Sequence, residues 1–120
     1  MVTGLFLMMM GASAAMFMRQ KSWWLRLHKA AGFGGAICIL SGFAAAITMI
    51  SLSGEEHFEI AHTYIGLVTV GFTVVTPLLG IIQFKMKNQA GRFRAIHRWS
   101  GRFTLLMSAI TVISGLIIIL

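Results

Sequence analysis

Four long apolar stretches alternate with three short polar ones along the chain, over about residues 2–18, 30–51, 60–84 and 99–120. A helix of about 20 apolar residues crosses the hydrocarbon core of a bilayer, which is about 30 Å thick. The stretches are continuously apolar rather than alternating, so each is predicted to be a helix and not a barrel strand. The pattern predicts an all-α membrane protein. Its single domain, over 1–120, is a four-helix transmembrane bundle with up-down-up-down topology, because the connections are short.

The composition supports a chain surrounded by lipid. Apolar residues make up 58% of the sequence and charged residues 11%, whereas soluble domains average about 45–50% and 25%. This excludes an ordinary soluble globule and makes the lipid bilayer the first partner of the chain. Cys38 is the only cysteine and lies inside an apolar stretch, so no disulfide can form within the chain.

The charges predict an orientation in the membrane. The net charge of +7 would suggest nucleic-acid binding in a soluble chain. Here the three acids, Glu55, Glu56 and Glu59, share one loop, and the basic residues flank apolar stretches, as cytoplasmic loops do. We expect no nucleic acid, cytoplasmic loops at 19–29 and 85–98, and outer termini and an outer loop at 52–59. We also expect a multi-pass protein of a bacterial inner membrane, with no cleavable signal. The basic residues are Arg19, Lys21, Arg26 and Lys29, then Lys85, Lys87, Arg92, Arg94, Arg98 and Arg102.

Three of the four histidines stand at the start of an apolar stretch and are followed by a glycine four residues later. Positions i and i+4 share a helix face, so each glycine clears space beside its histidine. A haem needs an imidazole nitrogen for its iron and room for the porphyrin along the helix. The alternative, interfacial histidines with glycines that serve helix packing, remains open. The pairs are His28 with Gly32, His62 with Gly66, and His97 with Gly101.

The order of the helices suggests which histidines meet. The second and fourth stretches run in the same direction, so His28 and His97 are expected at the cytoplasmic end and could ligate one haem b iron. His62 lies at the outer end, where a second haem is possible, and His57 is expected to be a solvated loop histidine. Basic residues near His28 and His97 could neutralise haem propionates, with Arg94 and Arg98 the nearest candidates beside Lys29 and Arg102.

At these residues the sequence resembles the cytochrome b561 and ferric-reductase-like transmembrane family. The stretches that carry the resemblance are HKAAGFGGAICILSGF from His28, HTYIGLVTVGFTVVTPLLGII from His62, and HRWSGRFTLLMSAITVISGL from His97. The resemblance implies four core helices that each give one histidine, two bis-histidine haems near opposite membrane faces, and His28 paired with His97.

The first stretch departs from the pattern of that family because it has no histidine. The missing residue would fall at or just before Met1. Either the chain starts further upstream or the outer haem has been lost, so we expect one haem b and treat a second as possible. Ascorbate or ferric-reductase activity is not carried over from the resemblance.

The expected function is that of a membrane b-type cytochrome that transfers electrons through bis-histidine haem. We expect it to act as a small subunit or partner of a larger redox complex, or to meet quinone or another cytochrome, rather than as a stand-alone enzyme. The first alternative is a haem-free scaffold subunit of a membrane complex. The second is a small proton-coupled exporter, which would need a carboxylate within a span, and all three acids lie in the loop.

Overall fold

The structure is a computed structural model that describes residues 1–54 and 61–120. These residues form four α-helices and one short 3₁₀ helix. The helices are α1 (Val2–Phe17), α2 (Trp24–Ser53), α3 (Ala61–Lys85), η1 (Lys87–Gln89) and α4 (Ala90–Ile119). The all-α prediction is therefore confirmed. The predictions for the three glutamates and for His57 lie outside the described residues.

Two of the predicted helix boundaries are wrong. The second and fourth helices were expected from residues 30 and 99, but α2 begins at Trp24 and α4 at Ala90. The error arises because hydropathy marks where a helix enters lipid, whereas leucine, lysine and arginine are good helix formers that continue it beyond the apolar part. The connections are consequently 18–23 and 86–89 instead of 19–29 and 85–98, and His28 and His97 lie inside helices instead of at their starts.

Three of the four described helices are long and apolar enough to cross a membrane: α2, α3, and α4 together with η1. The 16 residues of α1 rise about 24 Å, a little less than the hydrocarbon core. Pro77 lies within α3. At its C-terminal end α2 is terminated by Gly54, whose φ of 72° is a left-handed conformation that glycine adopts without strain.

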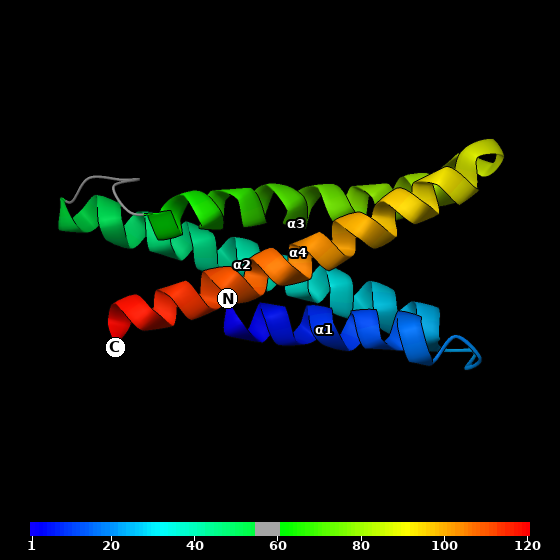
Figure 1. Cartoon of the computed structure of the whole chain (residues 1–120), viewed down its shortest axis with the longest axis horizontal. Helices are drawn as coiled ribbons and strands as arrows, with labels where there is room; N and C mark the ends of the chain where they lie inside the picture. The colour runs from blue at the N-terminus through cyan, green and yellow to red at the C-terminus, as the bar shows by residue number, and fades with distance from the viewer. Residues whose placement is uncertain (55–60) are drawn as a thin grey trace.

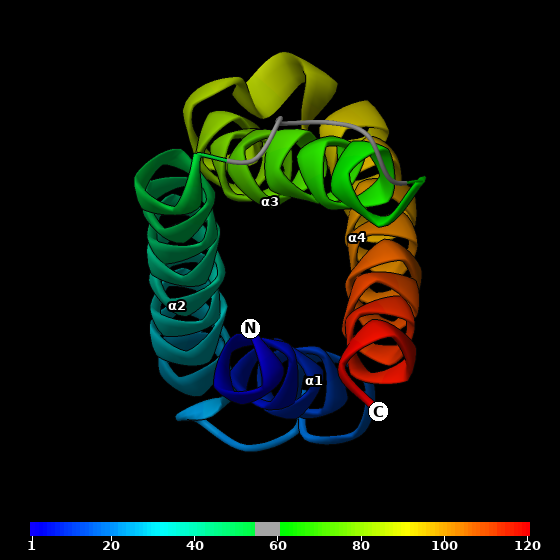
Figure 2. The same ribbon diagram turned by 90° about the vertical axis from the view of Figure 1, so that its left-hand side faces the viewer.

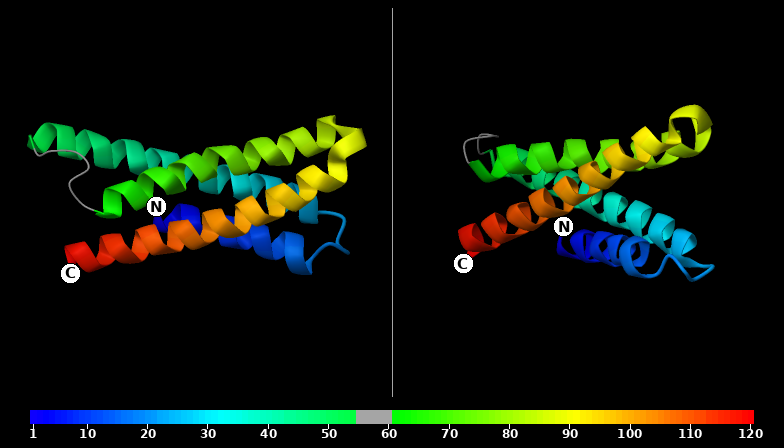
Figure 3. Two further views of the ribbon diagram at one scale, coloured as in Figure 1. Left: turned by 45° about the horizontal axis from the view of Figure 1, so that its top comes forward. Right: turned by 45° about the vertical axis from the view of Figure 1, so that its right-hand side comes forward.

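The helices lie around a common axis in an elongated molecule of 49 × 25 × 19 Å (Figures 1 and 2). The closest partners are α1 with α2 and α3 with α4, and the two pairs meet where α2 contacts α3 and α1 contacts α4. Figure 3 shows the two described connections, 18–23 and 86–89, at the same end of the molecule. The starts of α2 and α4 therefore lie near each other.

Small residues form most of the interior, with Ile39 and Met8 as the large side chains buried there, and most large apolar side chains face outward. The buried positions of α3 and α4 are glycine, threonine and serine only. Bulky side chains such as Phe6, Leu106 and Ile117 are more than half exposed. A soluble protein would have the opposite distribution, whereas helices in lipid associate through small residues and hydrogen bonds between helices.

Candidate functional site

The structure brings His28 of α2 and His97 of α4 together. Their ring centroids are 6.0 Å apart and their planes are nearly perpendicular, at 89°. Both rings are half-buried. The contact is possible because each histidine lies within eight residues of the start of its helix, toward the end of the molecule where the two connections meet (Figure 3).

Each of these rings is held through its Nδ1 atom by the neighbouring helix. His28 Nδ1–H donates to the backbone carbonyl of Gly11 in α1 at 2.9 Å, and His97 Nδ1–H donates to that of Thr76 in α3 at 2.9 Å. A carbonyl can only accept, so Nδ1 must carry the proton in both rings. In a neutral imidazole this leaves the lone pair on Nε2, and such a bond to a carbonyl orients and activates a metal-binding histidine.

The geometry of the two rings fits a shared metal ion. With bonds of about 2 Å between imidazole nitrogen and metal, two rings on opposite sides of one ion have centroids about 6 Å apart, as His28 and His97 do. A Cβ atom added at Gly32, one turn after His28, would meet no atom within 4 Å. The residues present therefore fit a haem, which His28 and His97 would hold through their Nε2 atoms beside the open space at Gly32.

A second glycine, missed in the sequence, adjoins the His97 ring. A Cβ atom placed on Gly80 would lie 3.1 Å from His97 Cε1, so the ring occupies space that only glycine leaves free. Gly115 has the same relation to His62, at 3.0 Å from its Cε1. The glycines predicted beside these rings, Gly101 and Gly66, instead face threonines of the partner helix at 3.8 Å.

One spacing in the sequence could have revealed these contacts. The pattern histidine, glycine, hydroxyl, hydroxyl, hydroxyl, glycine recurs with steps of 4, 3, 4, 3 and 4 in both helices. Since 18 residues make five full turns, the last glycine lies on the same face as the first histidine. Each histidine thus meets the last glycine of the other helix. The positions are His62, Gly66, Thr69, Thr73, Thr76 and Gly80 in α3, and His97, Gly101, Thr104, Ser108, Thr111 and Gly115 in α4.

His62 lies at the other end of the α3–α4 pair. Its Nδ1–H donates to Ser114 Oγ at 2.8 Å, and the Ser114 hydroxyl donates in turn to the Thr111 carbonyl at 3.1 Å. From His97 to Ser114 along α4 the rise is about 25 Å. His62 therefore has the same ring tautomer as the other two histidines but cannot share their metal ion.

The four basic residues proposed to neutralise haem propionates all have exposed side chains. Arg94 Nε donates to the Ala90 carbonyl of its own helix at 3.4 Å, and Arg102 lies over the Trp99 ring at 5.2 Å from its centroid. Lys29 Nζ lies 4.6 Å from the centroid of Phe84. Arg98 adjoins His97 in the sequence. Their role beside propionates stays a prediction.

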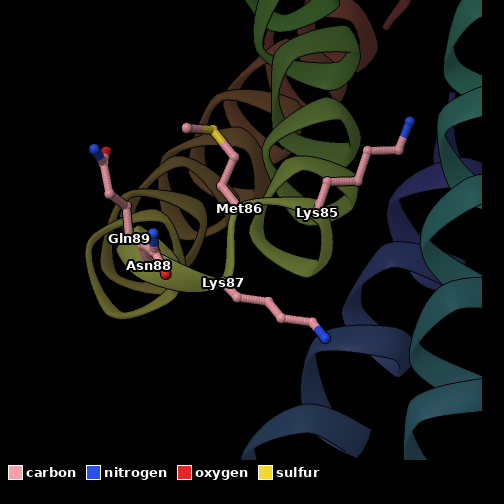
Figure 4. A pocket seen from close by; sticks show the side chains of 5 residues that line it. All are labelled: Lys85, Met86, Lys87, Asn88 and Gln89. Carbon is pink, nitrogen blue, oxygen red and sulfur yellow. The ribbon is translucent and has the colours of Figure 1, made fainter.

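A separate surface hollow lies at the connection between α3 and α4. Its volume is about 350 Å³ and residues 85–89 line it. In Figure 4, the side chains of Lys85 and Lys87 extend to the side on which α1 and α2 are drawn, whereas Met86 and Gln89 extend the other way. The hollow contains none of the histidines and adds positive charge to the end of the molecule that carries His28 and His97.

One of three comparisons with known proteins gives a match. No curated protein and no solved structure is significantly similar to the chain. The family model for eukaryotic cytochrome b561 matches residues 1–119. This match covers all four helices, including the first, which has no histidine. The chain therefore belongs to the cytochrome b561 family, and is an integral membrane protein of a family that binds haem b and transfers electrons.

Proposed function

We propose that this chain ligates one haem b between His28 and His97 and transfers electrons within the membrane as a bis-histidine cytochrome. The observation that carries the proposal is the 6.0 Å pairing of two imidazoles whose Nδ1 atoms are both held by backbone carbonyls. The haem would supply the one-electron redox chemistry. The protein would supply two neutral nitrogen ligands in fixed orientations and a bundle that excludes water.

The same arrangement favours electron transfer over reaction with a substrate. His28 and His97 would both be used to hold the haem, which would then supply one-electron transfer. The perpendicular rings are each held by a hydrogen bond within a different helix pair, so each ring has a fixed orientation. We infer that the chain works with a larger redox complex, a quinone or another cytochrome, and does not act as a stand-alone enzyme.

The reduced-minus-oxidised visible spectrum of the purified protein tests this proposal. His28→Ala and His97→Ala should each abolish or strongly alter the low-spin haem spectrum, because each removes one axial bond. His62→Ala is the matched control and should leave that spectrum intact, since His62 lies about 25 Å away. A normal spectrum in both single variants would refute the pairing. A wild-type protein without haem would support a haem-free scaffold subunit.

We propose one haem per chain. His62 is held in a metal-binding tautomer by Ser114, but no described residue of α1 is a histidine that could face it. Extracted haem measured against protein by quantitative amino-acid analysis should give a ratio near one. A ratio near two that falls to one in His62→Ala would mean that His62 holds a second haem.

We further propose that the helices cross the bilayer in alternating directions, with the connections 18–23 and 86–89 in the cytoplasm. The basic residues lie within or near these two connections, as the positive-inside rule predicts for cytoplasmic loops. In a Cys38→Ser background, a cysteine at Ser53 should react with an impermeant reagent from outside, and one at Asn88 only after permeabilisation. The reverse pattern would overturn the orientation. A bacterial inner membrane stays a prediction, since the matching family model describes eukaryotic proteins.

A further inference from the structure

The strongest feature beyond the histidines is a cluster of three buried hydroxyls between α3 and α4, one helical turn from His97. Thr76 Oγ1 lies 2.6 Å from Ser100 Oγ and 2.8 Å from Thr104 Oγ1. Thr104 Oγ1 also donates to the Ser100 carbonyl at 2.8 Å. All three side chains are at least nine-tenths buried. We call these three residues the hydroxyl cluster.

One direction of donation satisfies all three hydroxyls. Ser100 donates to Thr76, Thr76 donates to Thr104, and Thr104 donates to the Ser100 carbonyl, so each hydrogen has one acceptor. Such a chain links Thr76 of α3 to two successive turns of α4. In a medium without competing water, these bonds hold the two helices in one register.

Thr76 has a second role through its backbone. Its carbonyl accepts the Nδ1–H of His97 at 2.9 Å, and its hydroxyl is fixed to Ser100, three residues after His97 on α4. The carbonyl and the hydroxyl of one residue therefore fix the histidine and the helix that carries it. The next residue, Pro77, has no N–H, so α3 lacks the ladder bond that would end on the Thr73 carbonyl. Bonds to α4 stabilise this turn in place of that ladder bond.

We propose that Thr76, fixed by the hydroxyl cluster, is a positioning residue that aligns the His97 imidazole and thereby sets the midpoint potential of the haem. This inference rests on the proposed function, because it requires that His97 is an axial ligand. A well-aligned Nδ1–H bond to a carbonyl raises the basicity of the imidazole. A more basic ligand stabilises ferric over ferrous iron, so the hydroxyl cluster lowers the potential.

The substitution Thr76→Val tests this directly, because valine has the shape of threonine and keeps the backbone carbonyl but lacks the hydroxyl. We expect haem to be retained and the ferric-to-ferrous ratio at a fixed ambient potential to fall between about two- and tenfold, as the loss of one ordinary hydrogen bond predicts. The g values of the ferric electron paramagnetic resonance spectrum should shift as well. Thr76→Ser restores the hydroxyl and should restore both measurements.

Thr69→Val is the matched control. Thr69 lies two turns earlier on the same helix, is fully buried, and bonds to Thr111 of α4 at 2.8 Å. Its loss weakens helix packing to a similar extent without touching the His97 turn, so potential and spectrum should stay at the wild-type values. Equal effects of both valine variants on the potential and the spectrum would overturn the positioning role.

The two proposals fail in different ways. If His97→Ala retains a normal haem spectrum, the proposed axial pairing fails, and the role of Thr76 fails with it. If His97→Ala loses the haem but Thr76→Val has the wild-type potential and g values, only the role of the hydroxyl cluster is refuted.

Discussion

The two helix pairs of the molecule each hold one histidine ring in a fixed orientation, but they are packed by different chemistry. In each pair, one helix carries a histidine of the proposed haem site and the other gives the carbonyl that holds its Nδ1 atom. The α1–α2 pair achieves this by close backbone approach, since a Cβ atom on Gly35 would lie 2.8 Å from the Gly4 carbonyl oxygen. The α3–α4 pair achieves it with hydroxyls, as in the bond between Thr69 and Thr111.

The difference shows how a small membrane protein can fix a ligand without a large apolar core. Lipid is as apolar as leucine, so burial of large side chains does not drive these helices together. The packing of α1 against α2 at glycines uses van der Waals contact, so any atom added where the two helices cross disturbs it. Hydroxyl packing uses several moderate bonds, and the loss of one leaves the others. We therefore expect one substitution at the α1–α2 crossing to disrupt the packing of that pair. Each substitution of a hydroxyl between α3 and α4 should instead lower stability by a small amount.

The largest effect is expected from Gly35→Val. Its side chain would overlap Met8 and the Gly4 backbone, which cannot move aside without separating α1 from α2. Overpacking of this kind costs typically about 1–3 kcal/mol, and here it would also break the bond between His28 and the Gly11 carbonyl. We expect most of the haem to be lost, measured as haem per protein after purification.

Gly34→Val is the matched control for this prediction. A Cβ atom at Gly34 would lie 3.8 Å from Leu7 Cδ1, which is ordinary contact. Gly34→Val should therefore keep nearly all its haem. If the two variants lose haem equally, helix propensity at this point of α2 matters and the close approach to Gly4 does not.

A smaller effect is expected from Gly80→Ala, which makes the second pair more like the first. Gly80 lies four residues after Thr76, whose carbonyl accepts from His97. The corresponding position in α1, four residues after Gly11, is Ala15. An added methyl group at Gly80 would lie 3.1 Å from His97 Cε1 and must displace the ring by a few tenths of an ångström. We expect haem to be retained with a changed ferric electron paramagnetic resonance spectrum.

Two further alanine variants delimit this effect. Gly115→Ala displaces His62 in the same way and should leave the haem of His28 and His97 unchanged. Gly71→Ala meets no atom within 4 Å and should be neutral, or stabilise by up to about 1 kcal/mol through helix propensity. A changed spectrum in Gly71→Ala would show that the spectrum does not report ring displacement.

Much of this comparison could be predicted from the sequence, because helices in lipid leave a clear apolar pattern. The number of helices followed from that pattern, and so did the proximity of His28 and His97. The starts of α2 and α4 could not be located, since arginine and lysine continue a helix outside lipid and only the apolar part gives a hydropathy signal.

The contacts that hold the imidazoles were beyond the sequence analysis. The acceptors are the carbonyls of Gly11 and Thr76, and every residue has a carbonyl, so only helix register selects them. The contacts of Gly80 and Gly115 depend on the antiparallel register of α3 and α4 in the same way. The repeated 18-residue spacing from histidine to glycine was the one available signal for that register.

The small contribution of each hydroxyl between α3 and α4 to stability can be measured with Thr69 and Thr111, whose hydroxyls are 2.8 Å apart. Each single valine variant should lower the free energy of unfolding in mixed detergent micelles. The double variant should lose less than the sum, with a coupling of about 0.6 kcal/mol, the average for hydrogen bonds between membrane helices. Strict additivity would show that the two hydroxyls do not interact in the folded protein.

The smallest effect is expected at Ser108, the one interior position of α4 where hydroxyl packing is incomplete. Its side chain is 3% exposed, and its Oγ finds no hydrogen-bond partner among the described residues. A buried hydroxyl without a partner costs free energy, so Ser108→Ala should be neutral or stabilise by up to about 1 kcal/mol in the same unfolding assay. Thr104→Val, one turn earlier, removes a bonded hydroxyl of similar burial and should destabilise. If Ser108→Ala destabilises as much as Thr104→Val, its hydroxyl is paired in the membrane, by a buried water or by the Thr104 carbonyl, and the α3–α4 contact is then hydrogen-bonded along its whole length.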